Sequence, residues 1–220
     1  MIRRDYIMEM IEEFVRALAR LNSLKAGQRW NEAGEALDGE FRRLVGEGPE
    51  GVARLSEMEL LARLMRDGTR TVRTKCLMLV ALLKEAGDIA AAQGGEQESR
   101  ACYLKALHLL LDTLSREDVL DCPAFVPNIE LLRTALNGAP LPVQTCAMLM
   151  QHYERVGEFA KAEDALYGML EAEPDNPRIL EFGVGFYRRL KSQTDDALSA
   201  GNFSRQEIEQ GLRELGMRGA

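Results

Sequence analysis

The sequence predicts an all-α protein in which antiparallel helix pairs stack into a short α-α superhelix. Three observations support this prediction. Apolar residues recur with the 3.6-residue helical period along most of the 220 residues. No segment alternates apolar and polar residues over strand length between turn signals. Glycine, proline and asparagine mark short turns between the periodic segments, and short turns join antiparallel neighbours. The expected helices cover about residues 4–24, 30–45, 56–66, 71–93, 96–114, 126–136, 143–156, 159–172, 177–198 and 204–215.

The N-terminal segment, residues 1–67, opens with a strongly amphipathic helix. The residues expected to face inward are Ile7, Met10, Ile11, Phe14, Val15, Leu18 and Leu21. The second helix carries Ala33, Ala36, Leu37, Phe41 and Leu44 inward. Residues 46–51 contain three glycines and a proline, which indicates a loop. Ser56 and Glu59 have the spacing of a capping box and begin a short helix that Gly68 is expected to end.

The middle of the chain is predicted to be a long helix pair followed by a less regular stretch. Gly94 and Gly95 separate the two helices of the pair, which spans residues 71–114. Residues 115–142 form an irregular connection, with a short turn of helix from Ser115 to Cys122 and a helix that begins at Pro127.

The C-terminal third has the clearest boundaries. Gly157 separates a helix pair within residues 143–176. Asn176 is the expected N-cap of the next helix because Pro177 suits a first helical position. Residues 177–217 then hold a helix and a final capping helix. Phe203, Ser204, Glu207 and Ile208 combine a capping box with a hydrophobic staple at the start of the capping helix.

Two segments have the residue spacing of a helix-pair repeat of about 34 residues. Counted from Val143 as position 1, positions 7, 11, 15, 20, 24 and 32 hold Leu149, Tyr153, Gly157, Ala162, Leu166 and Pro174. Counted from Val80, positions 4, 7, 8, 11, 15, 20, 24 and 27 hold Leu83, Ala86, Gly87, Ala90, Gly94, Ser99, Tyr103 and Ala106. Met150, Cys146 and Leu111 depart from the pattern.

These positions resemble the tetratricopeptide (TPR) repeat, in which a small residue at position 20 lets two helices approach. The whole chain also resembles an uncharacterised bacterial family of TPR-like proteins, through its RRDYI start and its SRQEIEQGL-type final helix. The resemblance implies a single helical domain over residues 1–220, and it implies no known activity.

Charge and composition exclude several classes of partner and location. The net charge of −7 disfavours nucleic acid and anionic membranes as partners. The longest purely apolar run, Cys76–Leu83, is far shorter than the roughly 20 residues of a membrane-spanning helix. The four cysteines form no Cys-x-x-Cys pair, and three of them lie in apolar helical runs. We therefore expect a cytoplasmic protein in a reducing compartment.

We expect no enzyme activity, metal or cofactor. Neither His108 nor His152 has another metal-binding residue at a ligand spacing. The adjacent acids Glu12-Glu13 and Asp195-Asp196 point in different directions on a helix, which does not suit acid–base catalysis. Phosphate-binding, nucleophile-elbow and zinc-protease motifs are absent from the sequence. Gly183-x-Gly185 lies within a predicted helix and favours close helix packing, and the paired methionines favour core filling.

The TPR resemblance implies a concave face lined by the first helix of each pair. The polar side chains expected on that face are Gln144, Gln151, Glu154, Arg155, Arg178, Glu181, Arg188 and Arg189. The Lys and Asn residues that would clamp a C-terminal carboxylate are missing from these positions, so the chaperone-tail-binding kind of TPR is not supported. A peptide-binding groove and an ordinary solvated face both remain possible.

Three functional hypotheses follow. The first is a non-enzymatic interaction or scaffold protein that binds a protein or peptide. The second is a self-associating structural protein, for example a homodimer through the N-terminal helix. The third is a small-ligand binder or enzyme, which a deep pocket holding His108 or His152 beside an acid would favour.

Overall fold

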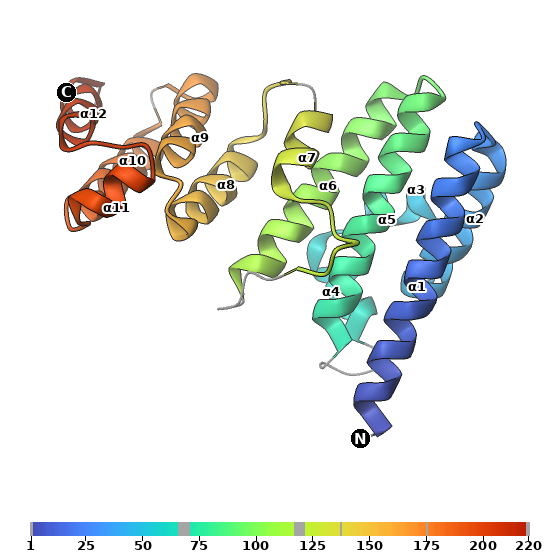
Figure 1. The fold of residues 1–220 in the computed structure, drawn as a ribbon. Coiled ribbons are helices and arrows are strands. Elements are labelled where there is room, and N and C mark those ends of the chain that lie inside the picture. Colours follow the sequence, from blue (N-terminus) through green and yellow to red (C-terminus); the bar gives the residue numbers. More distant parts are fainter. Residues whose placement is uncertain (1, 66–70, 117–121, 137, 175, 219–220) are drawn as a thin grey trace. The chain divides into compact units, whose positions relative to one another are not determined.

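A computed structural model describes residues 2–65, 71–116, 122–136, 138–174 and 176–218 (Figure 1). None of these residues lies in a β-strand, and the helices pack against each other in pairs, so the predicted all-α class is confirmed. The chain divides into two compact units, residues 1–138 and 139–220. The boundary falls inside the expected connection 115–142. The expectation of a single domain over residues 1–220 stays a prediction.

The helices lie close to where the sequence places them. Unit 1 contains α1 (Ile2–Ala26), α2 (Trp30–Val45), α3 (Pro49–Arg54), α4 (Glu57–Leu64), α5 (Val72–Ala92), α6 (Glu96–Ser115) and α7 (Ile129–Ala135). Unit 2 contains α8 (Val143–Val156), α9 (Phe159–Ala172), α10 (Pro177–Leu190), α11 (Asp195–Ala200) and α12 (Arg205–Arg218).

Unit 1 is built around α5, which is apolar on all sides from Cys76 to Leu83. Every residue from Lys75 to Leu83 is buried. A helix that is apolar all round must be enclosed by other elements. Here α5 packs against α6, α2 and α4, and Figure 1 shows it between α6 and the α1–α2 pair.

A close approach of α5 and α6 depends on Gly87. A Cβ atom at this position would lie 2.7 Å from the ring of Tyr103, closer than Cβ atoms are found to approach other atoms. The two residues stand at the small position 8 and the large position 24 of the repeat register that begins at Val80. The small residue therefore makes room for the large one.

Two sequence predictions for unit 1 are wrong. Residues 46–51 are not a loop throughout, because Pro49 occupies the first position of the short helix α3. Val15 is 45% exposed and not part of the core, because it lies about a quarter turn around α1 from the buried Phe14, Leu18 and Leu21, at the edge of the face that they form.

The last helix of unit 1 begins later than expected. The helix α7 begins at Ile129 and not at Pro127. Asn128 is its N-cap, because Oδ1 of the Asn128 side chain accepts a hydrogen bond from the Leu131 amide at 2.7 Å. The expected turn of helix after Ser115 and the expected stop at Gly68 lie in part or wholly outside the described residues. The capping box of Ser56 and Glu59 at the start of α4 is confirmed.

In unit 2 the antiparallel pair α8–α9 matches its predicted bounds. Gly157 caps α8 in the left-handed region, with φ of +80°, where glycine is favoured over other residues. Ala162 and Tyr153 are both buried, as the repeat register predicts. Cys146, Leu149 and Leu166 also lie in this core.

The helix predicted over residues 177–198 is divided in two. Its start is confirmed, since Asn176 caps α10 and Pro177 is the first helical residue. However, α10 ends at Leu190, and α11 begins five residues later at Asp195 with Thr194 as its N-cap. The hydroxyl of Thr194 accepts a hydrogen bond from the amide of Ala197 at 3.2 Å, which explains the separate start.

The final helix α12 docks on α10, as predicted. Ile208 is buried and Leu212 is half-buried. Ser204 Oγ accepts a hydrogen bond from the amide of Glu207 at 3.3 Å and donates one to its carboxylate at 2.7 Å. At Gly211 a Cβ atom would lie only 2.1 Å from the buried ring of Tyr187.

A second close approach lies at Gly183 on α10. A Cβ atom there would lie 2.8 Å from Leu215 of α12 and 3.0 Å from Leu166 of α9. Close packing, and not ligand binding, therefore accounts for the glycine at this position. The methionine prediction is correct for Met150, which is fully buried, and wrong for Met8, which is 51% exposed on α1.

Two glycines of α12 give opposite predictions for the same substitution. Gly211→Ala should lower the free energy of unfolding by about 1–3 kcal/mol, because the new methyl group overpacks against Tyr187. Gly216→Ala should raise it by about 0.5–1 kcal/mol, because nothing lies within 4 Å and alanine favours the helix. Urea denaturation measures both. Equal effects of the two substitutions would contradict the docking of α12 on α10.

Candidate functional site

An open groove of about 1090 Å³ lies in unit 1 and is formed by α2, α3, α5 and α6; we call it the α2–α6 groove. The residues that line it are Gly34, Leu37, Asp38, Arg42, Glu47, Gly48, Pro49, Glu50, Gly51, Ala53, Arg54, Ala86, Ile89, Ala90, Gln93, Gln97, Glu98, Ala101 and Cys102. Four helices and the turn before α3 meet here, so segments distant in the sequence share one surface.

The floor of the groove consists of small and aliphatic side chains. Leu37 and Ile89 are buried beneath it, whereas Ala90 is half-buried and Ala101 is exposed. Alanines at these positions keep α5 and α6 from filling the space in front of them. The result is an apolar surface that remains open, and such surfaces are typical of the central part of an interface.

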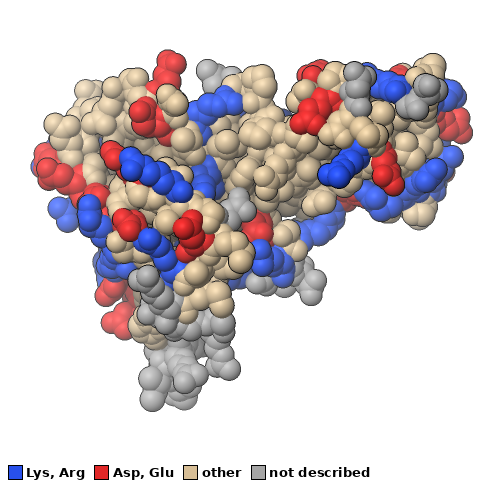
Figure 2. All heavy atoms as spheres, turned by 180° about the vertical axis from the view of Figure 1, so that it is seen from behind, with Lys and Arg blue, Asp and Glu red and all other residues tan. Residues whose placement is uncertain are grey.

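The rim of the groove is charged, with an excess of acidic residues. Its carboxylates are Asp38, Glu47, Glu50 and Glu98, and its guanidinium groups are Arg42 and Arg54. Arg42 pairs with Asp38 at 2.6 Å, and Arg54 lies 3.8 Å from Glu50. Figure 2 shows that acidic and basic side chains are interspersed over the molecular face it displays. The rim therefore combines local ion pairs with a net negative charge.

The cysteine of the groove is not a nucleophile at neutral pH. Burial, followed by the negative charge of Glu98, raises the pKa of Cys102 to about 11. Only the thiolate is strongly nucleophilic. Burial also raises the pKa of Cys76 to about 11. Both cysteines therefore act as small apolar residues, as their sequence context suggests.

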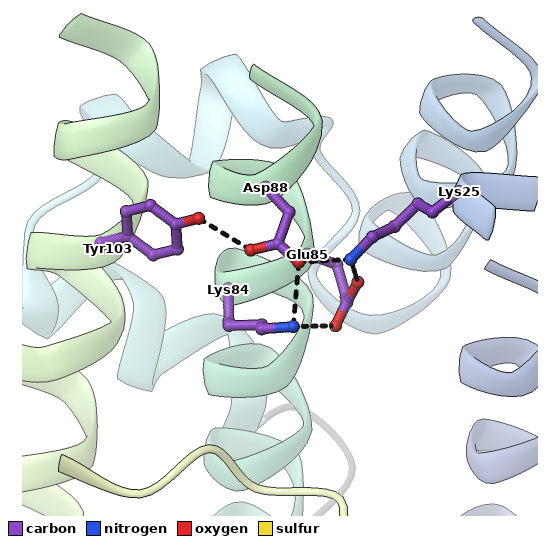
Figure 3. Close-up of polar contacts among 5 residues, drawn as sticks. All are labelled: Lys25, Lys84, Glu85, Asp88 and Tyr103. Carbon is purple, nitrogen blue, oxygen red and sulfur yellow. Dashed lines mark hydrogen bonds and ion pairs between the residues drawn. The ribbon is translucent and has the colours of Figure 1, made fainter. Parts of the chain in front are cut away.

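A cluster of charged side chains lies on α5 next to the groove and joins three helices (Figure 3). Lys25, in the last turn of α1, places its Nζ 2.5 Å from Oε2 of Glu85 and also contacts Asp88. Lys84 lies 3.0 Å from Glu85 and 2.9 Å from Asp88. Tyr103 of α6 donates a hydrogen bond to Oδ1 of Asp88 at 2.7 Å. Two ammonium groups thus balance two carboxylates.

The cluster changes the pKa values of its members. Burial by itself would raise the pKa of Asp88, but hydrogen bonds from Lys25, Lys84 and Tyr103 outweigh it and lower the pKa. Burial by itself would lower the pKa of Lys84, but the carboxylates of Asp88 and Glu85 outweigh burial and raise it. Burial and the hydrogen bond to Asp88 both raise the pKa of Tyr103. The contacts therefore favour the charged forms of Asp88 and Lys84, and the ion pairs of Lys25 with Glu85 and Asp88 are suited to holding α1 against α5.

The polar residues predicted for a concave face lie on α8 and α10 of unit 2. The structure brings two of them together: the guanidinium of Arg189 donates to both oxygens of Glu154, at 2.6 and 2.8 Å. Glu154 is half-buried in this pair. The exposed residues of the set are Gln144, Gln151, Arg155, Arg178, Glu181, Arg188 and Arg189. An ion pair between α8 and α10 agrees with the expectation that these two helices are neighbours.

Neither histidine lies in a described metal site. Both His108 and His152 are half-buried. Among the described residues, no group of three His, Cys, Asp or Glu side chains is placed to hold a metal ion. The described helices also include none that is long and apolar enough to cross a membrane.

Comparison with known sequences assigns the chain to a family. Residues 1–218 match a family of unknown function (DUF6483). The chain belongs to this family. No curated protein and no solved structure matches the chain. The match to the DUF6483 family thus covers both units.

Sequence reasoning did not locate the α2–α6 groove of this DUF6483 protein. The groove depends on α3. The glycines among residues 46–51 indicate a loop, so the sequence does not predict this helix. Pro49 was the available signal, since proline is favoured at the first helical position. The small residues Ala86 and Ala90 fit the repeat register from Val80, and this register gives no sign that α2, α5 and α6 leave space in front of them.

Removing one member of the charged cluster should destabilise the protein more than removing a surface charge. Lys25→Met leaves the buried Glu85, which is 6% exposed, with a single cationic partner. We expect it to lower the free energy of unfolding by about 3 kcal/mol. Arg43→Met is the matched control, since the exposed Arg43 also pairs with two carboxylates, Glu40 at 2.6 Å and Glu13 at 3.1 Å. Its cost should stay below about 1 kcal/mol. Similar costs in chemical denaturation would contradict the structural role of the cluster.

The lowered pKa of Asp88 predicts a specific dependence on pH. In the folded protein the pKa of the Asp88 carboxyl lies below its ordinary value. The cluster therefore stabilises the fold at pH values above the pKa that Asp88 has in the unfolded chain. This contribution is lost as the pH falls through the folded pKa, below about pH 4. The difference in stability between wild type and Asp88→Asn should therefore narrow between neutral and acidic pH. A constant difference in denaturation experiments across that range would contradict the interpretation.

Proposed function

We propose that this DUF6483 protein is a non-enzymatic protein-interaction or scaffold protein of TPR-like architecture. We further propose that the α2–α6 groove binds a short segment of a partner protein. The observation that supports binding at this place is the open apolar floor inside a charged rim. Its volume of about 1090 Å³ lies at the upper end of the range for ligand pockets, which suits a peptide better than a small metabolite.

The charge of the rim favours a segment that contains Lys or Arg. Four carboxylates and two guanidinium groups surround the floor, and the nearest described partners of the guanidinium groups are acids of the same rim. Complementary charge raises association rates and disfavours wrong partners. Small apolar side chains of the segment would contact Ala90 and Ala101, while its cationic group would lie near Glu98.

The TPR-like architecture is supported by the packing at the repeat positions. Gly87 makes room for Tyr103 in the pair α5–α6, and Ala162 is fully buried in the pair α8–α9. The ion pair between Glu154 and Arg189 joins the helices that would line a concave face. The exposed polar residues of α8 and α10 would then offer a scaffold protein a second contact surface. The cytoplasmic location belongs to the same proposal.

A peptide-display selection tests the groove directly. A random library is selected on the wild type and on Ala101→Trp, whose indole would occupy the floor. Ala172→Trp is the matched control, because Ala172 is exposed at the end of α9, away from the groove residues. We expect peptides with Lys or Arg beside small apolar residues to bind the wild type and Ala172→Trp, and to lose binding to Ala101→Trp.

The charge of Glu98 provides an independent check on the same peptides. Glu98→Gln should weaken binding several-fold at low salt and reduce its dependence on ionic strength, because the removed carboxylate no longer attracts the cationic group. Enriched peptides that bind Ala101→Trp as well as wild type would place the binding site elsewhere. A selection that enriches no peptide for the wild type would contradict the proposed function.

A further inference from the structure

The exposed side of α1 carries apolar side chains that the described residues of unit 1 leave uncovered. Met8 is 51% exposed and Val15 is 45% exposed. Ile11 is half-buried beside them, and Ala19 is exposed one turn further on. These four residues, which we call the α1 stripe, are spaced three or four residues apart and therefore lie along one side of the helix. The adjoining side of α1, about a quarter turn away, packs in unit 1 through Phe14, Leu18 and Leu21.

The charges along one flank of the α1 stripe form an ordered pattern. Glu9 and Glu12 lie in the first half of α1, and Arg16 and Arg20 lie in the second half. All four side chains are exposed. The helix therefore carries its acids before its bases along an outward-facing flank. A helix with this pattern is complementary to a second copy of itself that runs in the opposite direction.

We propose that two copies of this chain associate through α1 in an antiparallel helix pair. With the pair centred between residues 14 and 15, Glu9 faces Arg20 of the second copy, and Glu12 lies beside Arg16 of the second copy. The twofold axis repeats both contacts. A parallel pair would instead align acids with acids and bases with bases. Val15 of each copy lies near the axis, where the exposed apolar surface of the two stripes is buried.

The size of the stripe sets the expected strength of the association. The helix has 25 residues and is about 37 Å long, but the α1 stripe spans only about three turns. An interface of one such helix pair lies at the small end of protein–protein interfaces. We therefore expect a reversible dimer whose population depends on concentration. The association involves none of the residues of the α2–α6 groove, so the two proposals are independent.

Sedimentation equilibrium over a concentration series tests this proposal on the full chain. The wild type should approach the dimer mass at the highest concentrations. Val15→Glu should raise the dissociation constant by about tenfold or more, because it places two carboxylates near the axis. Arg188→Glu is the matched control on an exposed position of α10, and it should leave the dissociation constant unchanged.

Charge reversal tests the antiparallel contacts themselves. Glu12→Arg places arginines beside Arg16 of the second copy, and Arg16→Glu places carboxylates beside Glu12. Each variant alone should dimerise about tenfold more weakly than the wild type. An equimolar mixture should recover a heterodimer, because the two variants are then complementary. A wild type that stays monomeric throughout, or variants that dimerise as the wild type does, would overturn the proposal. Unchanged circular dichroism spectra exclude misfolding as the cause of weaker association.

Discussion

The enclosure of α5 is the constraint on which the structure of unit 1 depends. From Cys76 to Leu83 every side chain of this helix is apolar and buried, so no side of the stretch tolerates water. Burial of a leucine-sized side chain stabilises a fold by about 1.5–3 kcal/mol, so exposing this stretch would cost more than a typical domain's whole stability. The surrounding helices α2, α4 and α6 therefore have to pack on all sides of it.

The second half of α5 has a different role because its composition changes. Lys84, Glu85 and Asp88 form the charged cluster with Lys25 of α1 and Tyr103 of α6. On another side of the same turns, the small side chains of Ala86 and Ala90 leave the α2–α6 groove open. One helix thus anchors the core, fixes α1 through buried charges and provides the floor of the proposed binding groove. A groove built on such a rigid element is preformed, which lowers the entropic cost of binding a peptide.

Local signals in the sequence predicted most helix boundaries. Helix ends are predictable where one residue favours the backbone geometry of a cap or a first turn, as at Gly157, Asn176 and Pro177. Such a prediction needs no information about distant contacts. The prediction failed where two local signals competed. Pro49 begins a helix amid glycines that suggested a loop, and Thr194 begins a new helix in a stretch without a glycine or proline to mark the break.

The functional surfaces were harder to predict because they depend on packing between distant segments. The groove requires α2, α3, α5 and α6 together, and no single segment contains its signature. The 3.6-residue period predicts that Val15 faces the core. However, Val15 lies at the edge of the inward-facing set of residues, and its side chain is exposed. The sequence predicts that Glu154 and Arg189 lie on one polar face. It does not predict that the two side chains form an ion pair.

Native-state hydrogen exchange tests the central role of α5 most directly. If α5 is the enclosed element that supports both the charged cluster and the groove, its amides from Cys76 to Leu83 should exchange only through global unfolding of unit 1. They should therefore be the slowest in that unit, while the short helices α3 and α4 exchange through local opening. Exchange of the α5 amides as fast as those of α4, well below the global free energy of unfolding, would contradict this account.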